Sequence, residues 1–128
     1  MINAQERPSS NQRILCVEDD LDTCEFLAIL LGEYSFQFAH TISSALPAVE
    51  TEKHDLYILD NWLPDGSGID LCRTIRQQYP TTPILFTSGS VKEDEIEEAL
   101  EAGADQYLLK PCEPEQLKEI IKDLLFRN

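Results

Sequence analysis

The chain lacks both a long apolar run and an excess of positive charge. No apolar stretch approaches the roughly 20 residues of a membrane-spanning helix, and residues 1–13 are polar, unlike a secretory signal peptide. Ten lysines and arginines stand against 24 aspartates and glutamates, which leaves a net charge of -14. Nucleic acids and anionic lipids bind clustered positive charge, so we expect neither as a direct partner. The sequence predicts a soluble cytoplasmic protein whose partners carry basic surfaces.

The chain also lacks the spacing of a metal-binding or redox cysteine motif, and it contains no internal repeat. None of the four cysteines forms a C-x-x-C pair, and three of them lie within or beside apolar runs, as buried reduced thiols do. With 128 residues, of which 42% are hydrophobic, the chain is long enough to bury a core without disulfides. We expect a flexible leader over residues 1–12 and one domain over residues 13–128.

What the sequence does contain is a set of four apolar runs that each end in polar residues. If the runs are strands of one parallel sheet, their carboxyl ends meet at one edge, where function sits in such sheets. Carboxylates crowded there and withdrawn from water need a bound cation, a lysine, or both. In chain order, Glu18 and Asp19 follow the first run, Asp60 the second, Thr87 and Ser88 the third, and Lys110 the fourth.

Apolar runs of strand length alternate with longer segments in which apolar residues recur at helical spacing. Five such units predict an α/β fold, a doubly wound parallel sheet with helices on both faces. The predicted strands cover residues 14–17, 36–39, 56–59, 84–87 and 106–109.

The helix ends follow from capping residues, glycine and proline. We expect a helix over residues 23–33 with Asp22 as its N-cap, and a helix from Thr41 that loses regularity at Pro47. Ser90 has the spacing of an N-cap for the fourth helix, which ends at Gly103. The third helix follows a turn over residues 64–68 and ends before residue 80, and the fifth carries an apolar stripe over residues 117–125.

The motifs at the strand ends carry a family resemblance. Residues 14–20, 59–66, 83–89 and 107–111 together resemble the receiver domain of two-component response regulators, in the same order and at suitable spacing. The resemblance runs from about Arg13 to the C-terminus. It implies a flavodoxin-like sheet with strand order 2-1-3-4-5. Because the given sequence ends directly after the predicted fifth helix, we expect a receiver of the single-domain type with no output domain encoded here.

The resemblance assigns chemistry to the acidic residues. Asp60 matches the phosphoacceptor, whose carboxylate attacks a phosphoryl group and becomes an acyl phosphate. Glu18, where the family more often has aspartate, and Asp19 match the acidic pair that holds Mg²⁺ (or Mn²⁺). Asp60 itself and the backbone carbonyl of Trp62 would complete the protein ligands, a set of oxygens that suits magnesium.

The remaining matches concern charge and switching. Lys110 matches the lysine that pairs with the acceptor and then with a phosphate oxygen, and its peptide bond to Pro111 is typically cis in the family. Ser88, with Thr87 as a one-residue alternative, matches the switch hydroxyl. Tyr107 matches the aromatic that moves with this hydroxyl and reshapes the face of the fourth helix, fifth strand and fifth helix.

Trp62 and Ser90 stand two residues beyond Asp60 and Ser88, at receiver positions that tune the lifetime of the phosphoryl group. The resemblance further implies a histidine kinase or phosphotransfer protein as donor, a downstream protein partner, and a monomer or phosphorylation-dependent dimer. No catalysis is expected beyond the chain's own phosphorylation and dephosphorylation.

Other interpretations remain open from the residues alone. A flavodoxin-like domain shares the topology, but the acidic loop after the first strand would repel a cofactor phosphate. A phosphohydrolase with an aspartyl-phosphate would carry a second acid where Trp62 stands. A degenerate receiver would serve only for docking, and the acidic fourth helix is equally a docking surface or a solvated face. We expect His40 and His54 at the surface or a strand edge, away from the acidic residues.

Overall fold

Five parallel strands form the central sheet in the spatial order β2-β1-β3-β6-β7. If these five strands are numbered one to five along the chain, their spatial order is 2-1-3-4-5. The predicted fold class and strand order are therefore confirmed. The computed structural model describes residues 12–126. The expected leader therefore lies outside the described residues except for Gln12, as do residues 127 and 128. The strands are β1 (Arg13–Val17), β2 (Ser35–Ala39), β3 (Leu56–Leu59), β6 (Ile84–Ser88) and β7 (Gln106–Leu109).

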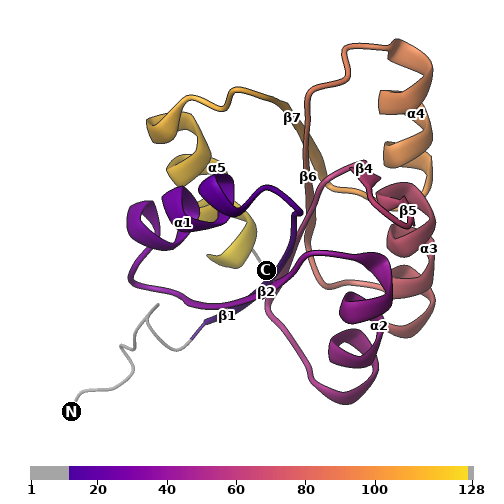
Figure 1. Ribbon diagram of the computed structural model, residues 1–128, viewed down its shortest axis with the longest axis horizontal. Helices are drawn as coiled ribbons and strands as arrows, with labels where there is room; N and C mark the ends of the chain where they lie inside the picture. Colours follow the sequence, from indigo (N-terminus) through magenta and orange to yellow (C-terminus); the bar gives the residue numbers. More distant parts are fainter. Residues whose placement is uncertain (1–11, 127–128) are drawn as a thin grey trace.

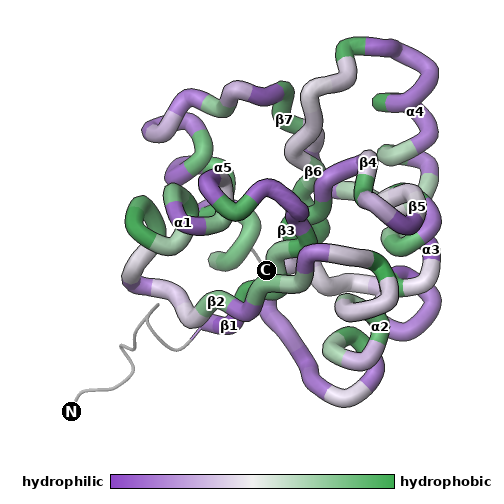
Figure 2. Tube along the Cα trace, viewed as in Figure 1, coloured by the Kyte–Doolittle hydropathy of each residue, from purple (hydrophilic) through white to green (hydrophobic). Residues whose placement is uncertain are grey.

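The three inner strands, β1, β3 and β6, are buried except for Arg13 at the start of β1. Strands that are apolar on both sides must be covered on both faces, and Figure 2 shows them as a hydrophobic centre. In the pairing register, Val17 lies beside Leu59, and Leu59 beside Phe86. The residues that follow β1 and β3 are therefore neighbours at one edge of the sheet.

The helices form a layer on each face of the sheet (Figure 1). Along β1, side chains alternate between two hydrophobic cores. Ile14 and Cys16 belong to the core under α1 and α5, and Leu15 and Val17 to the core under the other three helices. The helices are α1 (Leu21–Leu30), α2 (Ile42–Thr51), α3 (Gly68–Gln78), α4 (Glu93–Glu101) and α5 (Pro114–Phe126).

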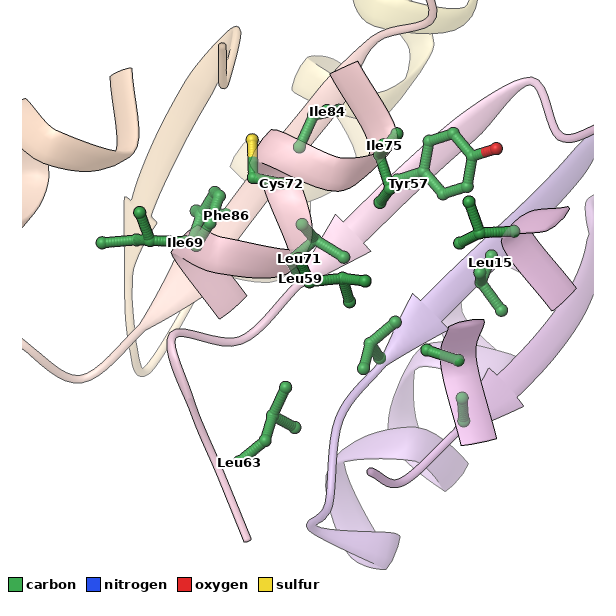
Figure 3. Packing of buried hydrophobic residues seen from close by; sticks show 14 of the residues in the cluster. Leu15, Tyr57, Leu59, Leu63, Ile69, Leu71, Cys72, Ile75, Ile84 and Phe86 are labelled. Atoms are coloured by element: carbon green, nitrogen blue, oxygen red, sulfur yellow. The ribbon is translucent and has the colours of Figure 1, made fainter. Parts of the chain in front are cut away.

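Of the three helices over the second core, α3 contributes the most buried residues, and Figure 3 shows its Leu71 and Ile75 beside the strand residues Tyr57 and Leu59. All four side chains are at most 2% exposed. Complete burial of side chains of this size stabilises a fold by about 1.5 to 3 kcal/mol each. Because α3 begins directly after the loop that follows β3, this packing also anchors that loop.

All four cysteines are free thiols, as predicted, and Cys16, Cys24 and Cys72 are buried. Burial raises the pKa of Cys24 and of Cys72 to about 11, so both stay protonated at neutral pH. Within residues 12–126, no helix is long and apolar enough to cross a membrane.

The start of α1 differs from the prediction. The helix begins at Leu21, and its N-cap is Asp20 instead of Asp22. The Asp20 carboxylate accepts hydrogen bonds from the backbone amide of Thr23 at 3.3 Å and from its hydroxyl at 2.5 Å. Asp22 lies in the first turn, where its charge is favourable to the helix dipole. Both aspartates precede the same apolar stripe, and the extended backbone of Asp20 together with its side-chain hydrogen bonds identifies it as the cap.

The prediction that Pro47 ends the regular part of α2 was wrong, because the helix continues from Ile42 to Thr51. A proline inside a helix removes one hydrogen bond, here to Ser43 four residues earlier. The first turn compensates, since Thr41 and Ser44 form a capping box. The Asp65 carboxylate adds hydrogen bonds from two further backbone amides of that turn, at 2.7 and 3.0 Å.

The start of α4 also differs from the prediction. Its N-cap is Lys92, without a side-chain capping bond, and Ser90 lies two residues earlier, where its hydroxyl accepts from the Lys92 amide at 3.3 Å. The end of the helix is as predicted, with Gly103 at a φ of 118° just beyond it. The predicted turn over residues 64–68 contains part of an antiparallel hairpin, formed by β4 (Trp62–Leu63) and β5 (Gly66–Ser67).

His54 is buried, whereas the sequence analysis expected it at the surface or at a strand edge. Its side chain is 2% exposed, and Nε2 lies 2.9 Å from the amide oxygen of Gln37 on the edge strand β2. Burial, assisted by the positive charge of Arg13, lowers the pKa of His54 below its ordinary value. The folded protein therefore resists protonation of this side chain.

We predict that acidification destabilises the protein partly through His54. The unfolded chain protonates His54 near pH 6.5, whereas the folded chain does so only at lower pH, so stability falls as the pH drops from about 7 through this interval. The free energy of unfolding, measured in urea across this range, should fall less steeply for His54→Gln. His40→Gln removes the chain's other histidine as a control. Equal slopes for His54→Gln and wild type would contradict the prediction.

Candidate functional site

Three carboxylates meet at the carboxyl edge of the sheet. Glu18 and Asp19 directly follow β1, and Asp60 directly follows β3. The two strands are paired, and the Asp60 amide donates a hydrogen bond to the Val17 carbonyl at 3.1 Å. One carboxylate oxygen from each acidic side chain lies within 4.8 Å of the other two. The structure thus brings together the three acids that the sequence analysis assigned to a metal.

Lys110 reaches two of these carboxylates from the end of β7. Its ammonium lies 2.6 Å from Glu18 Oε1 and 3.3 Å from Asp60 Oδ2. The side chains of Glu18 and Asp60 are only 3% and 12% exposed, so the attraction acts largely outside bulk water and is strengthened. One ammonium cannot balance three ionised carboxylates, and a divalent cation would supply the charge that is missing.

The pKa values of Glu18 and Lys110 show the cost of burying these charges. Burial raises the pKa of Glu18, and the hydrogen bond and charge of Lys110 offset only part of that effect. Burial alone would lower the pKa of Lys110, but its contacts with Glu18 and Asp60 outweigh burial and raise it. Lys110 therefore stays charged at neutral pH, while Glu18 holds its proton more readily than an exposed glutamate.

The donor set fits a hard divalent cation. All three side chains offer oxygen, and neither nitrogen nor sulfur belongs to the cluster. Magnesium prefers carboxylates and carbonyls, and manganese shares that preference. Trp62 opens β4 two residues beyond Asp60, and a contribution from its backbone carbonyl stays a prediction.

Ser88 and Thr87, at the end of β6, have different surroundings. The Ser88 hydroxyl accepts a hydrogen bond from the Ser90 amide at 3.2 Å, in the loop that leads to α4. Thr87 instead lines a cavity of about 480 Å³ between α1 and the loop that follows β7. Both side chains are at least 95% buried, with 1% and 5% exposed. Of the two candidates, Ser88 is the one connected to the α4 loop.

Tyr107 is connected to the same loop. Its ring stacks on Phe86 with a centroid distance of 5.9 Å and an interplanar angle of 4°. Its hydroxyl donates to the Ser90 carbonyl at 3.4 Å. Ser90 thus contacts both Ser88 and Tyr107, the two side chains assigned to switching.

Gly68 is a positioning residue that the sequence analysis did not single out. A Cβ atom at this position would lie 2.0 Å from the Asp60 carbonyl oxygen, so only glycine fits. Its amide donates to the Asn61 carbonyl at 2.7 Å. The first turn of α3 therefore packs directly on the backbone of Asp60. Nothing in the sequence indicates this approach, because a glycine in a turn-rich segment is ordinary.

The prediction that His40 lies away from the acidic residues was wrong. His40 Nδ1 is 2.9 Å from the backbone carbonyl of Glu18. The cause is the pairing of β1 with β2, which sets Val17 beside Ala39 and hence Glu18 beside His40. The His40 ring and the Cys24 thiol, 3.6 Å from the same oxygen, together fix the backbone of the first acidic residue.

Comparison with known proteins gives a consistent result. The family model of the response regulator receiver domain matches residues 14–122. The DNA-binding response regulator MtrA of Mycobacterium tuberculosis is 37% identical over 119 residues, which cover 91% of this chain and 52% of that protein. The response regulator protein PilR of Pseudomonas aeruginosa is 36% identical over 118 residues, which cover 91% of this chain and 26% of that protein.

A solved structure of a two-component response regulator from Clostridium difficile superposes with a TM-score of 0.87 at 34% identity. The match covers 91% of this chain and 98% of that one. The chain spans about half the length, or less, of the curated relatives it matches.

We predict that Mg²⁺ stabilises the folded protein through the acidic cluster. At a free concentration of ten times its Kd, a ligand of the folded state adds about 1.4 kcal/mol, or about 4 to 8 °C in the unfolding midpoint for a domain of this size. Asp19→Asn should reduce this shift of the unfolding midpoint, because Asp19 is exposed and its carboxylate provides one of the three clustered oxygens. The shift should also shrink on acidification, because the raised pKa of Glu18 lets protons compete with the cation.

The matched control is Asp123→Asn, which removes the same charge from the exposed surface of α5. It should keep the full shift, and chelation of Mg²⁺ should return wild type to its starting midpoint. Equal Mg²⁺-induced shifts of the midpoint for Asp19→Asn and Asp123→Asn would show that the cation binds outside the acidic cluster.

Proposed function

Because the chain belongs to the response regulator receiver domain family, we propose that it signals by accepting a phosphoryl group on Asp60. The observation that supports this most is the position of Lys110, whose ammonium bridges Glu18 and Asp60 beside Asp19. A nucleophilic carboxylate, a cation for the developing charge and oxygens for a metal are the three parts that phosphoryl transfer needs.

The proposed reaction begins with the Asp60 carboxylate. Lys110 holds Oδ2 at 3.3 Å, and Oδ1 makes no hydrogen bond with any residue from 12 to 126, so it is the free nucleophile. Oδ1 attacks phosphorus, the bond from phosphorus to the donor breaks with its electron pair leaving on the donor, and an acyl phosphate results. Bound Mg²⁺ would neutralise charge on the phosphoryl oxygens.

Return to the resting state is hydrolysis of the acyl phosphate, in which water attacks phosphorus and releases the Asp60 carboxylate and inorganic phosphate. Lys110 stabilises the charge in both directions because it stays protonated. We assign Trp62 and Ser90 to the rate of this step. Trp62 is 61% exposed on β4, two residues from Asp60, where a bulky ring can limit the approach of water.

The proposed output is a change at the face of α4, β7 and α5. The phosphoryl group carries about -1.5 to -2 charges in place of the single charge of the carboxylate, and it brings strong acceptor oxygens. The Ser88 hydroxyl would leave the Ser90 amide to donate to a phosphoryl oxygen, and Tyr107 would move with it. Ser90 contacts both side chains, which supports coupled movement.

The donor proposed is a histidine kinase or a phosphotransfer protein in the cytoplasm, and the reader of the signal is a protein. The net charge of -14 argues against direct contact with nucleic acid. The protein would act as a monomer or as a phosphorylation-dependent dimer. Neither the flavin-binding nor the docking-only alternative gains support. Three acids follow β1 where a cofactor phosphate would lie, and every group needed for the chemistry lies at one edge.

We predict that Asp60→Ala abolishes labelling by a small phosphodonor such as acetyl phosphate in the presence of Mg²⁺. The variant lacks the nucleophile but keeps the ion pair of Lys110 with Glu18. Intact mass after incubation measures the labelled fraction, and the thermal unfolding midpoint checks that the variant is folded. Asp123→Ala removes an aspartate carboxylate from α5 instead, and this variant should be labelled to the same extent as wild type. Persistent labelling of Asp60→Ala would show that another residue accepts the phosphoryl group.

We further predict that Trp62→Asn shortens the life of the acyl phosphate. Asparagine opens the space beside Asp60 to water and keeps the exposed hairpin position. Decay is followed by intact mass after removal of the phosphodonor and should be several-fold faster than in wild type. Trp62→Phe retains an aromatic ring and should decay at nearly the wild-type rate. If Trp62→Asn decays at the wild-type rate, the indole does not protect the phosphoryl group.

A further inference from the structure

Asn61, directly after Asp60, is a buried amide that the assigned chemistry does not use. Its side chain is 1% exposed, and Nδ2 donates to Oε1 of Glu95, in the first turn of α4, at 3.4 Å. The amide oxygen is buried and has no hydrogen-bond partner among the described residues. A reversed amide would set this oxygen against the Glu95 carboxylate, acceptor against acceptor, so the assignment of Nδ2 to Glu95 holds.

Helix α4 is weakly attached to the rest of the domain. Ala99 is its one fully buried residue, and its N-cap makes no side-chain capping bond. The helix lies at the margin of its layer in Figure 1 and is mainly hydrophilic in Figure 2. Within residues 12–126, two side-chain hydrogen bonds join α4 to other elements, from Asn61 to Glu95 and from Arg73 to Glu98. Only the first of these comes from the loop that carries Asp60.

The negative charge of Glu95 makes its hydrogen bond with Asn61 sensitive to phosphorylation of Asp60. Glu95 is 18% exposed on its side chain, and the nearest cation in the described residues is Lys92, whose ammonium lies 4.0 Å away. The first turn of α4 also carries Glu93 and Asp94. Phosphorylation of the residue before Asn61 replaces the single charge of its carboxylate by about -1.5 to -2 charges, which adds up to about one negative charge close to this acidic turn. Repulsion between them acts against the contact.

We propose that Asn61 is a positioning residue that holds the first turn of α4 through Glu95, and that phosphorylation of Asp60 releases this turn by repelling the Glu95 carboxylate. The proposal rests on the proposed function and adds a second connection from the site to α4, separate from Ser88 and Tyr107. The orphaned amide oxygen supports it, because the Asn61 side chain makes this one hydrogen bond among the described residues and belongs to no hydrogen-bond network.

The test is hydrogen exchange of the amides of α4, measured by mass spectrometry on unmodified and phosphorylated protein, with the phosphorylated fraction read from intact mass. In wild type, exchange over residues 93–101 should rise on phosphorylation. In Asn61→Leu it should already be raised in the unmodified protein, by roughly two- to tenfold as expected for one lost hydrogen bond. The further rise on phosphorylation should then be much smaller than in wild type.

Two variants separate release from a merely structural role. Glu95→Gln keeps an acceptor for Asn61 but removes the charge. Amides of α4 should therefore stay protected in the unmodified protein, and their exchange should rise less on phosphorylation than in wild type. Arg73→Ala removes the other hydrogen bond to α4, from a side chain that does not adjoin Asp60, and should raise exchange in both states while leaving the increment intact. Glu95→Gln also serves if Asn61→Leu fails to fold.

An unchanged increment in Glu95→Gln or in folded Asn61→Leu, with phosphorylation confirmed by mass, would overturn this proposal and leave the proposed function intact. Absence of phosphorylation in wild type would instead overturn the proposed function and, with it, the release step. The comparison of unmodified Asn61→Leu with wild type would still decide whether the contact holds α4.

Discussion

The contact of Lys110 with Glu18 and Asp60 is the interaction on which the arrangement of the site depends. Two largely buried carboxylates beside a third are unfavourable unless a cation lies between them. The lysine supplies that cation, at 2.6 and 3.3 Å. It leaves negative charge that a divalent ion can balance. Because these contacts also raise the pKa of Lys110, the lysine stays charged at neutral pH.

The sheet topology makes this contact possible and connects it to the surface. β1 and β3 are neighbours, so their acids meet, and Lys110 reaches them from β7 across the end of β6. Ser88, which ends β6, lies in the strand between the lysine and the acids. Two routes then leave this edge toward α4: one through the Ser90 backbone, and one from Asn61 to Glu95. A charge added to Asp60 would therefore act on groups that already contact α4 and the loop before it.

Much of this could be predicted from the sequence, for a physical reason. Continuous apolar strands require a covered parallel sheet, and a parallel sheet gathers its carboxyl ends, so the acids and Lys110 were expected together. Contacts between residues that are distant in sequence could not be predicted in the same way. His40 lies beside Glu18 because of the register of β1 with β2, and Gly68 is required by the approach of α3 to Asp60. Pro47 is tolerated because Asp65, distant in sequence, supports the first turn of α2.

The central claim is that Asp60 is the nucleophile of a phosphoacceptor site built from these strand ends. Trapping the covalent intermediate tests it most directly, because borohydride reduces an acyl phosphate to an alcohol and marks the acceptor permanently. Protein treated with a small phosphodonor and Mg²⁺ is reduced, digested and sequenced by mass spectrometry. We expect the reduced residue to be Asp60, and we expect less of it to be reduced when Mg²⁺ is omitted. A reduced residue elsewhere, or none in protein that carries the phosphoryl mass, would contradict the central claim.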